Sequence, residues 1–173
     1  GPCAVESREQ LFAAADAVLK DLLRRVHDDG TTLVVLRHAL DWAERLAAAG
    51  VCKFHSWMHG KRHWLGSNLF AVAHPLLADL PVNCGMNWQY QEFAEYFAER
   101  YGLLLEDEEV AVGFVGDHMH QVGTAVGVLR HGRGRIVLST LDILPRLAEP
   151  RPPCEVVRKV LCNYLTYAGG AQP

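Results

Sequence analysis

The spacing of apolar residues predicts an alternation of helices and short strands in the first third of the chain. Residues 6–26 carry apolar side chains at every third or fourth position and charged side chains between them, which is the pattern of an amphipathic helix. Residues 31–36 form a short, continuously apolar run that is typical of a buried strand. A second helix over residues 42–49, which Asp41 can cap, and another short strand over residues 51–54 follow.

Two apolar runs in the last third of the chain predict the centre of the sheet. Residues 125–129 and 135–139 are rich in apolar and β-branched side chains, and residues 131–134 between them contain two glycines that suit a tight turn. The second run ends in residues 139–142, where the polarity changes abruptly. Loops at the carboxyl ends of strands often hold the functional groups of open α/β sheets, so Asp142 is a candidate site residue.

The remaining periodic segments predict two helices and two strands. Residues 92–100 are expected to form a short helix, and residues 156–167 form the last amphipathic helix. Residues 102–105 and 110–115 are expected to be strands, separated by the acidic turn at residues 106–109.

Residues 55–90 interrupt this alternation with a long, irregular excursion. It contains the aromatic residues Trp57, Trp64, Trp88 and Tyr90, and its hydrophobic periodicity is poor. Long ordered loops in compact domains are often functional or interfacial. Aromatic side chains of this kind stack on sugar rings, pack under a loop, or contact a neighbouring domain. These four residues are therefore candidates for carbohydrate or interface contacts.

The alternation of helices and strands favours one α/β domain over residues 3–168. We expect a three-layer sandwich with a mostly parallel sheet and helices on both faces. Such folds normally open with a strand, whereas this chain opens with a helix. Either the first strand belongs to a longer protein from which the chain is excised, or the sheet lacks it, and we favour the former.

Composition narrows the classes of function. The 173 residues are half hydrophobic, 21% of them are charged, and the net charge of -3 comes without a basic block, which argues against a nucleic-acid binder. No apolar run approaches the roughly 18 residues that a membrane span requires. The five cysteines show no CxxC spacing and favour reduced thiols in an intracellular, cytoplasmic protein.

Several short motifs recur in this chain in a characteristic order. They are HPLLADLP at 74–81, MNWQY at 86–90, GTAVGV at 123–128, GRGRIVLSTLD at 132–142 and LCNY at 161–164. Their combination resembles a C-terminal accessory domain of glycoside hydrolases similar to family 2, the β-galactosidase- and β-glucuronidase-like enzymes, over about residues 33–167. The resemblance implies a flavodoxin-like fold of the class I glutamine-amidotransferase-like type.

The resemblance also implies a non-catalytic role. In that group a separate barrel domain with paired glutamates hydrolyses the substrate, and nothing in this chain matches those catalytic motifs. The parent protein is then expected to be a glycoside hydrolase acting on β-linked sugars. The implied partners are the catalytic barrel of the same polypeptide, further copies of the chain, and carbohydrate, with no cofactor.

Two other classes of function stay open. A carbohydrate-binding module would use the aromatic residues of the excursion. A free-standing amidotransferase-like enzyme would need a cysteine on a sharp strand-to-helix turn, with a histidine nearby. Residues 83–85, with Cys84 in the middle, are the nearest match, but they lack the glycine two positions before the cysteine.

Metal binding and hydrolysis by the chain itself are the weaker alternatives. His55, His59 and His63 are spaced to share one face of a helix, but no coherent set of four zinc ligands emerges, so we expect no metal. The acidic residues 106–109 are more typical of a solvated turn than of a glycosidase pair.

Overall fold

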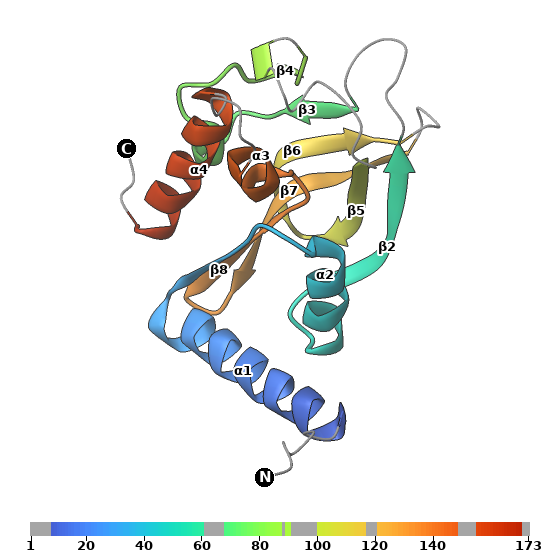
Figure 1. Cartoon of the computed structure of the whole chain (residues 1–173), viewed down its shortest axis with the longest axis vertical. Coiled ribbons are helices and arrows are strands. Elements are labelled where there is room, and N and C mark those ends of the chain that lie inside the picture. The colour runs from blue at the N-terminus through green and yellow to red at the C-terminus, as the bar shows by residue number, and fades with distance from the viewer. Residues whose placement is uncertain are drawn as a thin grey trace.

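A computed structural model of the chain describes residues 8–60, 68–87, 89–90, 100–116, 121–148 and 155–170, and all strands of this part belong to one mixed sheet (Figure 1). The elements in chain order are α1 (Arg8–Asp29), β1 (Thr32–Val35), α2 (Ala39–Ala48), β2 (Lys53–Gly60), β3 (Leu69–Ala71), the 3-10 helix η1 (Pro75–Leu77), β4 (Cys84–Gly85), β5 (Arg100–Glu106), β6 (Glu109–Val115), β7 (Val122–His131), β8 (Gly134–Ser139), α3 (Ile143–Ala148) and α4 (Glu155–Ala168).

The strand β7 lies at the centre of the sheet. Neighbouring strands follow the order β1-β8-β7-β6-β3-β4, and the pair formed by β2 and β5 joins the sheet where Leu103 lies opposite Thr124. The predicted hairpin is confirmed, because β7 and β8 pair antiparallel from His131 opposite Gly134 to Val126 opposite Ser139. Gly132, in the turn of this hairpin, has a φ of 57°, a conformation that glycine adopts at little cost.

The prediction of a mostly parallel, flavodoxin-like sheet is wrong. Among the described strand pairs only β1 and β8 run parallel, and the others are antiparallel. The reason lies in the connections. A very short turn joins β7 to β8, and such a turn can only return a strand antiparallel, whereas a parallel neighbour needs a longer crossover.

The α/β class and the helices on both faces are confirmed. Successive residues of β8 point to opposite sides: Ile136 and Leu138 join a core with α1 and α2, while Val137 joins a core with α3 and α4. All three side chains are buried, with at most 1% exposure. The apolar run of β8 therefore has the two-sided burial that its sequence predicts.

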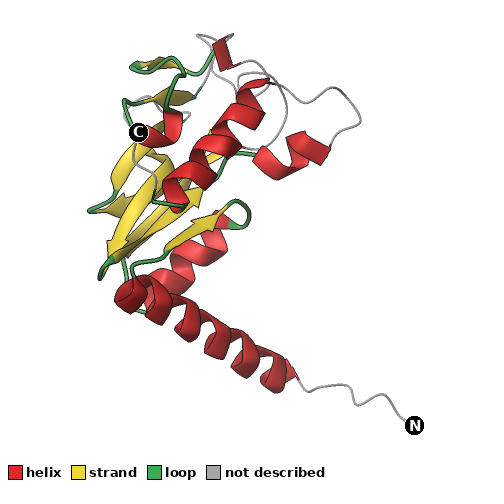
Figure 2. Cartoon of the chain, turned by 90° about the vertical axis from the view of Figure 1, so that its left-hand side faces the viewer, coloured by secondary structure: helices red, strands yellow, loops and turns green. Residues whose placement is uncertain are grey.

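Helix boundaries differ from their predictions by a few residues. The first helix, α1, extends to Asp29 and is followed by Gly30 at a φ of 73°. Its first turns project away from the rest of the molecule (Figure 2), and Val18 is 59% exposed. The second, α2, begins at Ala39 rather than Trp42, so the prediction that Asp41 caps it is wrong: His38 holds the cap position and Asp41 lies in the first turn. No helix in the described part of the chain is long and apolar enough to cross a membrane.

The excursion at residues 55–90 is more regular than its sequence indicates. Its first part continues β2 as far as Gly60, and β3, η1 and β4 follow later in it. The helix expected over residues 92–100 lies outside the described residues, apart from Arg100, which begins β5.

The ring of Phe114 packs where two glycines leave room for it. Phe114 on β6 is fully buried, and Gly60 on β2 and Gly102 on β5 lie against its side chain. A Cβ atom at Gly102 would lie 2.7 Å from three side-chain atoms of Phe114, and one at Gly60 would lie 2.6 Å from its Cζ atom. The close approach of the β2–β5 pair to β6 thus depends on the missing side chains of these glycines.

We expect Gly102→Ala to lower the free energy of unfolding by about 1–3 kcal/mol, because the added methyl group overpacks the site of Phe114. Urea unfolding followed by circular dichroism measures this change. Gly169→Ala is the matched control, since a Cβ atom there would come no closer than 3.4 Å to its neighbours. Equal stability of the two variants would contradict the packing argument.

Candidate functional site

The exposed aromatic surface of the described chain lies on β2. Trp57 is 48% exposed, and its ring meets those of His59 and Tyr101 edge-on, with centroids 6.4 and 6.3 Å away. Val122 is 57% exposed and lies with Trp57 in a shallow hollow of about 490 Å³. We call this hollow the Trp57 surface, which is formed by Ser56, Trp57, Met58, His59, Leu104, Gln121 and Val122.

A charged cluster lies at the start of the same strand. Glu106 on β5 accepts hydrogen bonds from Lys53, at 2.7 Å, and from the ring of His55, at 2.6 Å. These two donors hold the pKa of the Glu106 carboxyl below its usual value, and the Lys53 pKa is raised in return. Because the three side chains are largely exposed to solvent, the cluster contributes little to stability.

The structure describes two of the four aromatic candidates, Trp57 and Tyr90, and places them in different surroundings. Tyr90 is fully buried, its hydroxyl donates to the carbonyl of Pro81, and burial raises its pKa to about 12. Its ring therefore has no exposed face on which a sugar could stack. Trp64 and Trp88 lie outside the described residues. Of the two candidates that the structure describes, Trp57 is the one at the surface.

Asp142, the candidate at the end of β8, lies exposed on the loop before α3. Burial of the phenol is the main reason why the pKa of Tyr101 is raised, and the negative charge of Asp142 raises it further. Since the ring of Tyr101 also meets Trp57 edge-on, the two candidates Asp142 and Trp57 both lie close enough to Tyr101 to influence it.

The motifs that carry the family resemblance pack against one another. The side chain of Asn163 donates to the carbonyl of Ala78 at 2.9 Å, and Lys159 Nζ lies 2.7 Å from Asp79 Oδ2. Tyr164, fully buried on α4, donates to Ser139 Oγ at 3.3 Å. The segment around η1, the end of β8 and the helix α4 are joined by these contacts, although they are far apart in the sequence.

His74 is the buried titratable group of this region. Its Nδ1 atom accepts the backbone N–H of Leu76 at 3.1 Å and so caps η1. Its Nε2 atom lies 3.3 Å from Glu109 Oε1, and its ring lies 5.6 Å from that of Tyr167. Burial lowers the pKa of His74, Glu109 opposes this effect, and Arg135 adds to it. The ring is therefore neutral at pH 7 and holds its proton on Nε2.

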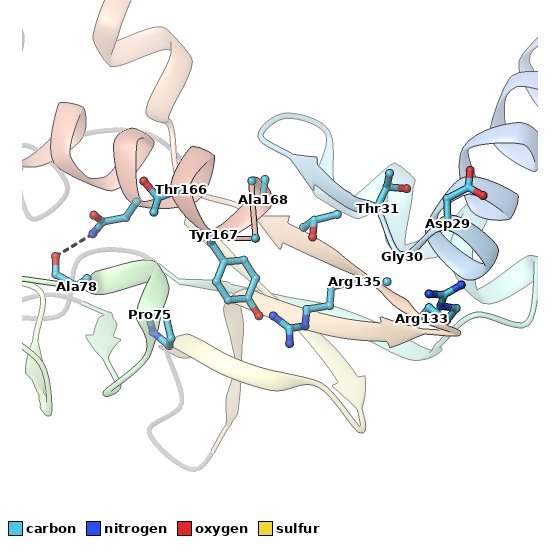
Figure 3. A pocket seen from close by; sticks show the side chains of 15 residues that line it. Asp29, Gly30, Thr31, Pro75, Ala78, Arg133, Arg135, Thr166, Tyr167 and Ala168 are labelled. Carbon is cyan, nitrogen blue, oxygen red and sulfur yellow. Dashed lines mark hydrogen bonds between the residues drawn. The ribbon is translucent and has the colours of Figure 1, made fainter. Parts of the chain in front are cut away.

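A groove of about 640 Å³ opens beside Tyr167 (Figure 3). The ends of α1 and α4, the starts of β1 and β8, the β7–β8 turn and η1 form its walls. Arg133 and Arg135 both line it, and the guanidinium of Arg135 lies 5.2 Å from the centre of the Tyr167 ring. Sequence reasoning missed this groove. The pair of arginines around Gly134 is visible in the sequence, but their closeness to the end of α4 is not.

The alternative chemistries find weak geometric support. Cys84 lies in the two-residue strand β4, paired with Ala71 of β3, and not on a strand-to-helix turn. His55 and His59 lie on a strand instead of a helix, and His63 is outside the described residues. Within the described residues, no group of three or more His, Cys, Asp and Glu side chains could hold a metal ion.

Comparisons of the chain with protein-family models, with curated proteins and with solved structures give no match. The resemblance to the accessory domain of glycoside hydrolases therefore stays a prediction from the sequence motifs.

We expect His74 to make the protein less stable in acid. The lowered pKa means that the unfolded chain takes up a proton below about pH 6.5 more readily than the folded chain does, so the contribution of His74 is full above that pH and is lost as the pH falls towards the folded-state pKa. Over that interval this group lowers the free energy of unfolding by up to about 1.4 kcal/mol per pH unit.

The variant His74→Asn isolates this effect. Asparagine does not titrate, and its side-chain oxygen can still accept the N–H of Leu76, so the variant should show a flatter dependence of stability on pH. Urea unfolding at several pH values between 7.5 and 5 measures both curves. His131, whose pKa is also lowered by burial, contributes equally to both proteins. Parallel curves would contradict the role assigned to His74.

Proposed function

We propose that this chain is an accessory, non-catalytic domain of a glycoside hydrolase acting on β-linked sugars. It packs through the Trp57 surface against the catalytic barrel of the same polypeptide or against a second copy. The observation that carries this proposal is the ring of Trp57, which is 48% exposed; Trp57 and the exposed residue Val122 both belong to the lining of this hollow. Large aromatic residues that combine with apolar neighbours in this way are enriched at the energetic centres of interfaces.

The open edge of β2 supports the same surface. Among the described strands, β2 pairs with β5 alone, so one edge of this eight-residue strand has no neighbour. Exposed edges are usually protected by charges, bulges or a covering segment. Lys53 and the irregular pairing between Phe54 and Ser56 protect the start of β2, whereas Trp57 lies farther along it. A packing partner at this edge would cover the part of the strand that these features leave open.

The motifs behind the resemblance support a non-catalytic role. Their polar side chains cap η1 at His74, hold Ala78 through Asn163, and join Tyr164 to Ser139. These polar groups form hydrogen bonds within the fold, as expected for residues whose role is structural.

A carbohydrate-binding module is the second candidate, and it is favoured by the same tryptophan. An exposed ring can stack on the apolar face of a sugar, and His59, whose ring meets that of Trp57 edge-on, can hydrogen-bond to hydroxyl groups. The two candidates differ in what covers Trp57.

The thiols are consistent with a reducing compartment. Cys52, Cys84 and Cys162 are free, and reduced cysteines are the rule in the cytoplasm. We therefore propose that the domain works there.

Photo-cross-linking tests the packing surface in cells that naturally make the protein. With p-benzoylphenylalanine in place of Trp57, we expect cross-links to a barrel domain of a glycoside hydrolase or to a second copy, identified by mass spectrometry. The same amino acid in place of Leu165 is the control, because Leu165 is 64% exposed on α4, away from the Trp57 surface. A cross-linking yield at residue 57 no higher than at residue 165 would contradict the proposal.

We expect the isolated chain to leave aryl-β-glycosides unhydrolysed and to show no change in tryptophan fluorescence with neutral galactose or mannose oligosaccharides. Turnover by the chain alone would overturn the accessory role. Saturable binding that is lost in Trp57→Ala would instead favour the carbohydrate-binding module, since removing the ring removes the stacking surface.

A further inference from the structure

The groove beside Tyr167 holds a positive charge for which the described part of the chain supplies no ion-pair partner. Arg135 is half-buried, and no carboxylate among the described residues lies within ion-pair distance of its guanidinium. Its guanidinium lies over the ring of Tyr167, and the two side chains point toward one another in Figure 3. The contact with the ring holds the guanidinium in place, so less side-chain freedom is lost when a ligand binds.

The ring of Tyr167 in turn packs against the buried ring of His74. The buried ring of His74 lies 5.6 Å from that of Tyr167, and His74 is fixed through its hydrogen bond to Leu76. Tyr167 thus supports Arg135, and the series His74, Tyr167, Arg135 forms a prearranged wall of the groove. Prearranged donors of this kind are what a binding site for an oxyanion requires.

Arg133 brings a second guanidinium to the same groove. It lies in the exposed β7–β8 turn, and one of its nitrogen atoms donates to the carbonyl of Asp28 at 3.2 Å. A guanidinium has five N–H donors, so Arg133 retains donors for a ligand after making this bond. The bond to the end of α1 keeps the side chain at the rim of the groove.

The rest of the lining favours a ligand that also donates hydrogen bonds. Thr31 and Thr166 bring hydroxyl groups, and Asp29 brings a carboxylate (Figure 3). The carboxyl-terminal ends of α1 and α4 both reach the groove, and such ends carry partial negative charge. A bare anion would be attracted by the arginines but repelled by these groups. A molecule with one oxyanion and several hydroxyl groups complements the arginines through the oxyanion, and the threonines, Asp29 and the helix ends through its hydroxyl groups.

We propose that this groove binds an acidic sugar, a monosaccharide unit that carries a carboxylate or a phosphate group, with Arg135 at the oxyanion and Arg133 at the rim of the groove. Its volume of about 640 Å³ lies within the range of roughly 300–1,000 Å³ that small-molecule sites occupy. The choice of a sugar rests on the proposed function, whereas the requirement for an oxyanion rests on the arginines alone. The site is separate from the Trp57 surface, and it would give the accessory domain a small-molecule ligand of its own.

Nuclear magnetic resonance titration at low salt tests the proposal with three probes: glucuronate, glucose 6-phosphate and uncharged glucose. We expect one or both charged sugars to bind and to shift the backbone amide signals of Gly30, Gly134, Gly169 and Gly170, which line the groove. Preference for glucuronate identifies a carboxylate as the group recognised, and preference for glucose 6-phosphate identifies a phosphate. Glucose should bind at least tenfold more weakly than the preferred charged sugar.

The variant Arg135→Gln should weaken binding of the charged sugar about tenfold or more, because a charge-assisted hydrogen bond is lost. Arg133→Gln, in the exposed turn, gives an independent reading if the loss of Arg135 disturbs the packing on Tyr167. Arg158→Gln is the matched control: it removes the same charge from α4 at an exposed position outside the groove, where Arg158 lies 3.6 Å from Glu155.

Three results would overturn the proposal. They are binding of glucose as tight as that of the charged sugars, an equal loss of affinity in Arg135→Gln and Arg158→Gln, and an absence of binding by both charged sugars up to tens of millimolar. None of them depends on cross-linking at Trp57, so failure of this site and failure of the accessory role can be told apart.

Discussion

The pairing of β7 on both edges is the constraint on which the rest of the structure depends. Residues Val126–His131 pair with β8, residues Val122–Val128 with β6, and Thr124 lies opposite Leu103 of β5. The side chains from Thr124 to Leu129 are buried on both faces, so the backbone groups of β7 must find partners within the sheet. Each neighbour of β7 pairs in turn with another strand. The strand β8 pairs with β1, β5 pairs with β2, and β6 pairs with β3, which pairs with β4.

This arrangement places the two proposed binding regions in different parts of the sheet. The Trp57 surface belongs to β2 and β5, with Val122 at the start of β7, whereas the groove lies near the turn at the far end of β7 and the end of α4. The ten residues of β7 span about 33 Å at the usual rise of a strand, so a ligand in one region need not touch the other. The proposed partner and the proposed ligand would therefore not compete for the same surface.

The motifs that suggested a family have a clear structural use. His74, Asn163 and Tyr164 are polar, and each is buried with a hydrogen bond that joins η1, α4 or β8. A buried polar group that loses its partner costs roughly 1–3 kcal/mol, so such residues are strongly constrained whether or not they take part in chemistry. These residues therefore have structural roles of their own, which leaves Trp57 and the two arginines of the groove as the groups available for binding.

Local pattern determined the elements, and tertiary contacts determined how they are combined. The helices α1 and α4, the hairpin of β7 and β8, and the two-sided burial of β8 follow from periodicity and from the glycines of one turn, because these signals act over a few residues. The direction of β2 does not follow, since its antiparallel partner β5 begins 40 residues after β2 ends and a run of apolar residues carries no information about orientation. The same limit applies to the sites. The sequence by itself marked Trp57 as a candidate, but only the folded chain separates it from the buried Tyr90 and brings Arg135 onto Tyr167, because burial and the meeting of distant segments are properties of packing.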